Sequence, residues 1–140
     1  MSDCIFCGIV ANTSLSSVVY EDSTILALMD IRPVTPGHTL VIPKIHCACL
    51  AELDEATGRR LFDVTMKIAQ AVRNSGVKCE GVNLFLADGE AAGQEVFHVH
   101  MHVIPRYKGD NFIIKPDYGA KPTRGELDKI AKQIKSAGNL

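Results

Sequence analysis

The stretch FHVHMHVIP, residues 97–105, contains three of the five histidines of the chain. Each is separated from the next by one apolar residue. Alternate side chains of a β-strand point to the same face of its sheet. A strand over 97–105 therefore places three imidazoles on one face, those of His98, His100 and His102, with Ile104 following on that face. The other face is predicted to meet the core and consists of Phe97, Val99, Met101 and Val103.

Four further segments have the short, β-rich composition of strands: residues 17–22, 24–31, 38–43 and 81–88. The first two lie so close together that they predict a hairpin. Pro36 and Gly37 precede the third and favour a turn.

Between residues 54 and 76 the pattern changes to that of an amphipathic helix. Asp54 is a suitable N-cap, and Gly76 lies where such a helix would end. The apolar stripe of this helix consists of Leu61, Thr65, Ile68 and Val72. The sequence alone leaves open whether this stripe packs into the core or into an interface between subunits.

A second amphipathic helix is predicted over about 123–137, where Thr123 and Glu126 have the spacing of a capping box. Antiparallel strands combined with separate helices are typical of the α+β class. We therefore expect one α+β domain over residues 1–140, with its core in about 4–110 and the second helix after it.

The composition restricts the function. Hydrophobic residues make up 46% of the 140 residues and the net charge is −1, which predicts a globular protein that lacks the charge for bulk binding of nucleic acid or an anionic membrane. No segment resembles a signal peptide or a run of roughly 18 apolar residues that spans a membrane. The odd number of cysteines, five, favours reduced thiols or metal ligands in a cytoplasmic protein over a disulfide framework.

A row of histidines fits two kinds of chemistry. Imidazole is a common transition-metal ligand, and its neutral form is also a nucleophile or general base at neutral pH. The loop ADGEAAGQEVF, residues 87–97, favours phosphate chemistry, because Gly89 and Gly93 let backbone N–H groups approach an anion. The phosphate interpretation is therefore preferred for the row as a whole.

The order His98-Val99-His100-Met101-His102-Val103-Ile104 resembles the signature of the histidine triad family. The similarity extends through CIFCGIV, MDIRPVTPGHTLVIPKIH and DGEAAGQEVFHVHMHVIPRYKGD and covers most of residues 4–110. It implies a fold with an antiparallel sheet of about five strands, a long central helix and a C-terminal helix. It also implies a hydrolase or transferase that acts at the α-phosphate of a purine nucleotide conjugate, either a phosphoramidate or a dinucleoside polyphosphate.

The resemblance assigns roles to individual residues. His100 would attack phosphorus and form a covalent nucleotidyl-histidine, His102 would contact the phosphate oxygens, and His38 would face the same site. In the same comparison Asp30 would bind the ribose hydroxyls and Ile31 would line the base pocket. No cofactor is required for this chemistry.

The phosphate loop both matches and departs from the family pattern. Gln94 matches a glutamine on the phosphate side of the site. Ala87 stands where many relatives have an amide, and Glu95 replaces a frequent Ser or Thr. Arg106 and Lys108 fit either contacts to additional phosphates or a solvated strand end.

Cys4 and Cys7 have the C-x₂-C spacing of half a structural zinc site. No second such pair completes it, so spacing alone leaves reduced cysteines equally plausible. The resemblance adds His46 and His98 as the remaining ligands of a structural zinc. His98 would then hold the metal, while the other two histidines of the row handle phosphate.

Two other functions compete with the nucleotide hydrolase. One is a nucleotide-binding regulatory partner in which hydrolysis is incidental. The other is a zinc hydrolase with all three triad histidines on one metal, which conflicts with the ligand set above. The resemblance further implies a homodimer, and the physiological substrate is not readable from the sequence.

Overall fold

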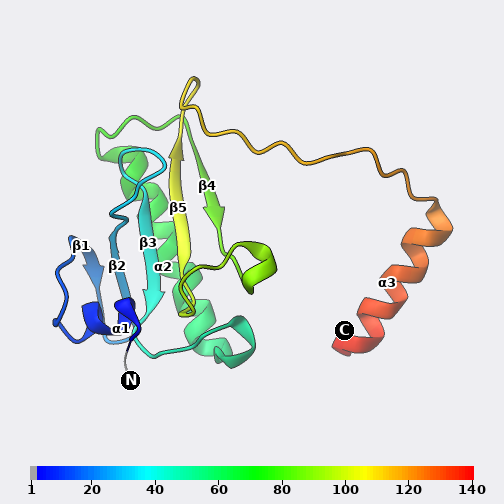
Figure 1. Cartoon of the computed structure of the whole chain (residues 1–140), viewed down its shortest axis with the longest axis horizontal. Coiled ribbons are helices and arrows are strands. Elements are labelled where there is room, and N and C mark those ends of the chain that lie inside the picture. The colour runs from blue at the N-terminus through cyan, green and yellow to red at the C-terminus, as the bar shows by residue number, and fades with distance from the viewer. Residues whose placement is uncertain (1–2) are drawn as a thin grey trace.

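The computed structural model describes residues 3–140, which form a five-stranded antiparallel sheet in the order β1-β2-β3-β5-β4 (Figure 1). Its strands are β1 (Val18–Glu21), β2 (Ile25–Met29), β3 (Thr39–Pro43), β4 (Gly81–Phe85) and β5 (Met101–Arg106). The helices are α1 (Ile5–Val10), α2 (Glu55–Asn74) and α3 (Arg124–Gly138), with short 3₁₀ turns η1 (Leu50–Glu52) and η2 (Glu90–Ala92). The predicted α+β class and its five-stranded antiparallel sheet are confirmed.

The long helix α2 covers one face of the sheet (Figure 1). Asp54 caps it by accepting a hydrogen bond from Thr57 N at 3.0 Å, and Gly76 follows its end with a φ of +88°. The predicted stripe is buried against β2, β3 and β5: Leu61, Thr65, Ile68 and Val72. The stripe therefore belongs to the core, where full burial of a Leu or Ile side chain stabilises by about 1.5–3 kcal/mol.

The opposite face of the sheet packs against α1. Phe6 and Ile9 of this helix contact a cluster formed by Leu26, Leu28, Leu40 and Ile42. Leu40 of β3 lies opposite His102 of β5 in the ladder. The histidine face of β5 is therefore the face that α1 covers, and the other face meets α2.

The strand predicted over 97–105 is four residues too long at its start, because β5 begins only at Met101. The register that pairs Val41 with Met101 would place Val99 opposite Pro43, and proline has no N–H to give to a ladder. Val99 N donates instead to Cys47 O at 2.7 Å. Val99 and Val103 do enter the α2 core as predicted, but Phe97 is 51% exposed and does not.

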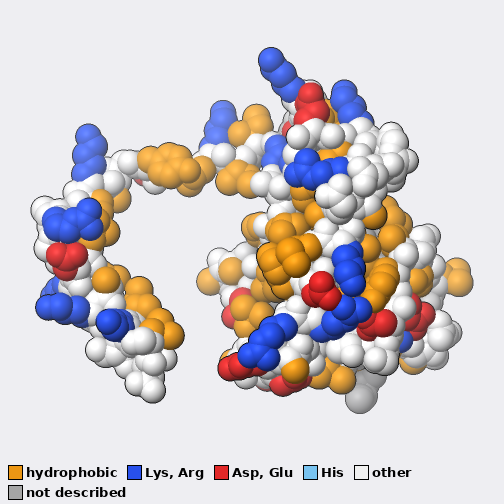
Figure 2. All heavy atoms as spheres, turned by 180° about the vertical axis from the view of Figure 1, so that it is seen from behind, with side chains coloured by type: hydrophobic (Ala, Val, Ile, Leu, Met, Phe, Trp, Pro, Cys, Tyr) orange, Lys and Arg blue, Asp and Glu red, His pale blue; other side chains and the backbone are white. Residues whose placement is uncertain are grey.

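Helix α3 has the predicted position and cap, with the full capping box between Thr123 and Glu126. An extended segment, residues 111–122, carries it away from the sheet (Figure 1). All residues of α3 are exposed, including the apolar side chains of Leu127, Ile130 and Ile134. Figure 2 shows the hydrophobic side chains of this helix on one side and its charged side chains on the other.

Among the described residues, no helix combines the length and apolar composition that crossing a membrane requires.

Candidate functional site: two histidine clusters

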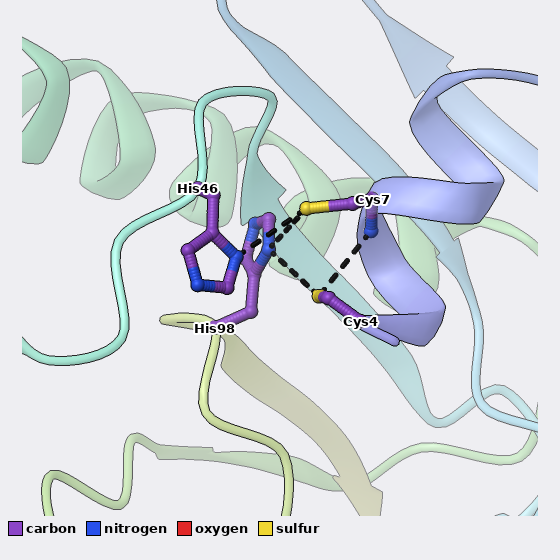
Figure 3. A group of neighbouring side chains, drawn as sticks. All are labelled: Cys4, Cys7, His46 and His98. Atoms are coloured by element: carbon purple, nitrogen blue, oxygen red, sulfur yellow. Dashed lines mark hydrogen bonds between the residues drawn. The ribbon is translucent and has the colours of Figure 1, made fainter. Parts of the chain in front are cut away.

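Two cysteines and two histidines from three distant segments meet beside α1 (Figure 3). Cys4 is the N-cap of α1, and its Sγ accepts a hydrogen bond from Cys7 N at 3.4 Å. His46 follows β3, and His98 precedes β5. One ligand atom from each of the four residues lies within 4.8 Å of the others. The structure thus brings together all four ligands that the resemblance implied.

The orientation of His98 in this group is fixed by the backbone. Its Nε2 lies 2.8 Å from Pro43 O, a group that can only accept, so Nε2 carries the proton. Its Nδ1 lies 3.4 Å from Cys4 Sγ and 3.6 Å from Cys7 Sγ. Burial lowers the pKa of this imidazole and favours the neutral ring. His98 therefore presents a lone pair to the two sulfurs.

His100 has the opposite arrangement. Its Nδ1 lies 2.7 Å from His98 O and must donate to this carbonyl. The proton of the neutral ring is thereby placed on Nδ1, and Nε2 keeps its lone pair. The side chain is 7% exposed and lines a cavity. A buried imidazole with a free Nε2 is suited to nucleophilic attack.

His38 and His102 form a hydrogen-bonded pair next to His100. Val34 N donates to His38 Nδ1 at 3.0 Å, so the neutral His38 ring carries its proton on Nε2. This Nε2 lies 2.9 Å from His102 Nδ1 and 3.5 Å from Asp30 Oδ2. The neutral His102 therefore accepts at Nδ1 and has an N–H at Nε2.

Burial also determines the charge of this pair. It is the largest cause that lowers the pKa of His102 to about 4, and the electrostatic interactions with His100 and His38 are smaller causes. Burial likewise lowers the pKa of His38, and the carboxylate of Asp30 partly opposes this shift. Both rings are therefore neutral near pH 7, as the hydrogen bonds above require.

His38, His100 and His102 line one cavity of about 760 Å³. Asp30 and Ile31 lie along the same cavity, and Ile31 is 91% exposed at its surface. Apolar side chains from α1 and the sheet complete the lining, among them Phe6, Leu28 and Leu40. A cavity of this size with apolar walls and a few polar groups is typical of small-molecule sites.

Gln94 does not line this cavity, although the family resemblance predicted that it contacts the phosphate. Its Oε1 accepts from Gly89 N at 2.8 Å, and its Nε2 donates to Ala48 O and Val96 O at 2.8 and 3.0 Å. The buried amide is thus fully used by the backbone and holds the loop in shape. Ala87, which lies two residues before Gly89 and stands where many relatives have an amide, is buried.

Arg106 likewise has other partners than a phosphate. Its guanidinium binds Asp110, with Nε 2.6 Å from Oδ2, and also contacts Asn83 Oδ1 and Phe112 O. Its pKa is raised, mainly by the hydrogen bond to Asp110. Of the two interpretations of Arg106, the structure favours that of a residue holding the end of the strand.

The sequence did not single out two neighbours of the histidines. The ring of Phe6 meets those of His98 and His100 edge to face, with centroids 5.7 and 5.2 Å apart. Arg32 lines the cavity and pairs with Glu95. Their positions between the two cysteines and directly after Asp30 and Ile31 were the only available signals.

Residues 12–109 match the family model described as the HIT domain, including all of the triad and His38. The chain belongs to the HIT family. A crystal structure of a HIT family member from Bacillus subtilis superposes with a TM-score of 0.89 at 39% identity and covers 96% of both chains. The fold and the family expected from the triad motif are therefore confirmed.

Two further comparisons bear on metal and activity. The crystal structure of a Zn-bound histidine triad family protein from Mycobacterium smegmatis is 40% identical, covers 96% of this chain and 97% of its own, and has a TM-score of 0.76. A protein from Arabidopsis thaliana named adenylylsulfatase HINT3 is 37% identical over 96% of this chain and 67% of its own length. The HIT domain and the name of the Arabidopsis relative support nucleotide hydrolysis as the general activity of the family.

Proposed function

We propose that this protein hydrolyses purine nucleotide conjugates at the α-phosphate through a covalent nucleotidyl-His100 intermediate. The observation that carries the proposal is the free Nε2 of His100 in the cavity, with Nδ1 held by His98 O. Phosphoramidates and dinucleoside polyphosphates are the two substrate classes that the family offers.

The proposed reaction has two steps. His100 Nε2 forms a bond to the α-phosphorus while the bond from phosphorus to the leaving group breaks, and the leaving group takes up a proton. The leaving group takes this proton from water, and His102 is suited to hold the phosphate oxygens, because its Nε2–H is set by the hydrogen bond from His38. Water then cleaves the bond from phosphorus to Nε2, which releases the nucleoside monophosphate and restores His100.

The remaining residues bind the substrate in this proposal. Asp30 lines the cavity, where its carboxylate oxygens can accept hydrogen bonds from the ribose hydroxyls, and exposed Ile31 offers an apolar surface to the base. Gln94 takes the role of shaping the phosphate loop rather than touching the substrate.

The test is hydrolysis of an AMP phosphoramidate and of a diadenosine polyphosphate in the presence of a chelator. We expect the wild type to hydrolyse at least one of them and to accumulate labelled enzyme in a single turnover with an α-³²P substrate, whereas His100→Ala does neither. A folded wild type that binds nucleotide without turnover contradicts the proposal and favours the regulatory binding protein. Activity lost with the chelator favours the zinc hydrolase.

We further propose that Cys4, Cys7, His46 and His98 hold one structural zinc. Two thiolates and two imidazoles are a closed tetrahedral set without an open position for substrate. The fit is supported by His98, whose Nε2–H is taken by Pro43 O so that Nδ1 faces the sulfurs. The metal would pin α1 to the segment before β5. Metal analysis of protein purified without added zinc should give close to one zinc per chain, and none would refute the site.

The homodimer implied by the family is proposed here with α3 as one of its contacts. Residues 111–140 carry six Lys and Arg against three Asp and Glu, whereas residues 1–110 carry nine against thirteen. A basic arm with an exposed apolar face is therefore complementary to the acidic body of a second copy. Sedimentation should give a dimer that Ile130→Asp weakens, and a 15.2 kDa species from the wild type at micromolar concentration would refute it.

A cytoplasmic location also stays a proposal. Its support is that none of the five cysteines forms a disulfide, the state that a reducing compartment maintains.

A further inference from the structure

An ion pair joins the two loops at the mouth of the cavity. Arg32 Nη2 lies 3.1 Å from Glu95 Oε2, and the two side chains are 83% and 77% exposed. Arg32 belongs to the loop after β2, where its N–H donates to Asp30 Oδ1 at 2.8 Å. Glu95 belongs to the loop before the triad, and both residues line the cavity. His100 lines the same cavity, so a leaving group that extends from the α-phosphate toward this rim meets the pair.

The charged groups around the cavity are few. Among its described lining residues, Asp30 and Glu95 are anions and Arg32 is the one fixed cation, since His38 and His102 are neutral near pH 7. An α-phosphate that binds Arg32 would take up this single fixed positive charge. A second anionic group on the substrate would find no partner and would face a carboxylate.

The two carboxylates are not equally available. Asp30 accepts a hydrogen bond from Arg32 N, lies near His38 Nε2 and binds the ribose in the proposal above. Glu95 has one hydrogen-bond partner, the guanidinium of Arg32. An ion pair as exposed as this one is weak, so a substrate can displace one partner and bind to either Arg32 or Glu95. Arg32 is then free to meet the phosphate and Glu95 to meet the leaving group.

We propose that Glu95 selects substrates whose leaving group carries a protonated amine, and that Arg32 neutralises Glu95 until such a substrate binds. The proposal rests on the nucleotidyl transfer proposed above and narrows its substrate class to phosphoramidates of amines with a second, cationic amine. In that reaction the P–N bond breaks as the bond from phosphorus to His100 Nε2 forms, and the departing nitrogen takes up a proton. The cationic end of the leaving group contacts Glu95 throughout and is not changed chemically.

The contacts of Arg106 favour phosphoramidates over dinucleoside polyphosphates as substrates. Additional phosphates need cations, and the arginine that the sequence offered after the triad binds Asp110 and Phe112 O instead. It does not line the cavity.

The experiment compares three AMP phosphoramidates of similar length, made with amines that end in an ammonium, a methyl or a carboxylate group: diaminobutane, pentylamine and aminobutyrate. We expect wild-type kcat/KM to fall in this order, by roughly twofold to fivefold at each step, as for other exposed charge pairs. Glu95→Gln should make the three substrates nearly equal, and Glu95→Lys should reverse the order. Added salt should reduce the preference of the wild type.

Glu90→Gln is the matched control, because Glu90 is an exposed carboxylate of η2 in the same loop that does not line the cavity. It should keep the wild-type order. If all three substrates turn over through His100 and Glu95→Gln keeps the wild-type order, the proposal for Glu95 is wrong while the hydrolase stands. If the folded wild type cleaves none of them and no other nucleotide conjugate, the proposed hydrolase fails. If it cleaves only a polyphosphate, the hydrolase stands and the selection of amines is wrong.

Discussion

His98 and His100 lie two residues apart, are both buried, and expose opposite ring nitrogens. His98 donates from Nε2 to Pro43 O and turns Nδ1 toward two thiols. His100 donates from Nδ1 to His98 O and leaves Nε2 free in the cavity. A backbone carbonyl thus decides for each ring which nitrogen is available, and one row of histidines serves two kinds of site.

The strongest test of this division is the loss of the nucleophile. We expect His100→Ala to lower kcat by at least about 10³-fold, because the covalent step has no substitute for Nε2. Zinc content should stay near that of the wild type, since His100 touches neither thiol. Loss of zinc from this variant would show that the two clusters are one site.

Removal of the proposed zinc should have the converse result. Zinc that binds only the native state stabilises the protein by about 4 kcal/mol when the free zinc concentration is about a thousand times the dissociation constant of the site. We therefore expect the chelator-treated wild type and Cys7→Ser to unfold at lower temperature. Below that temperature they should keep most of the nucleotide turnover. A chelator that abolishes turnover without changing the unfolding midpoint would contradict a structural metal.

Local sequence signals predicted the fold well where the stabilising contact is also local. Asp54 and Thr123 cap their helices within three residues, and the stripe from Leu61 to Val72 records burial directly. The predicted start of β5 was wrong, because the residue that would pair with Val99 is Pro43. Pro43 lies 56 residues earlier in the sequence and has no N–H to donate to Val99.

The roles of site residues show the same limit. The motif placed His98, His100 and His102 correctly on one segment, but their tautomers depend on carbonyls and N–H groups that only the fold brings near. Gln94 matched its motif in sequence, yet its amide donates to Ala48 O and accepts from Gly89 N.

The pair of His38 and His102 offers a smaller effect within the reactive cluster. His38→Ala removes the N–H that faces His102 Nδ1 and lets the His102 ring exchange its proton between both nitrogens. We expect kcat to fall by about a hundredfold, the contribution of one positioned hydrogen-bond donor to the reacting phosphate, with KM little changed. His38→Gln, whose amide can donate to the same nitrogen, should recover part of the loss. Equal defects in both variants would mean that His38 acts by packing alone.

The smallest effect concerns pH and stability. Folding lowers the pKa of His102 from 6.5 to about 4, so between these values the unfolded chain binds more protons than the native protein. The stability due to the neutral ring is therefore present above pH 6.5 and is lost as the pH falls toward 4. His102→Asn cannot titrate, so its free energy of unfolding should fall less than that of the wild type over this range. The two should diverge by up to about 1.4 kcal/mol per pH unit. Urea unfolding of both proteins at several pH values measures the divergence. Parallel curves would show that His102 is protonated as readily in the native state as in the unfolded chain, and that the neutral pair with His38 does not exist in solution.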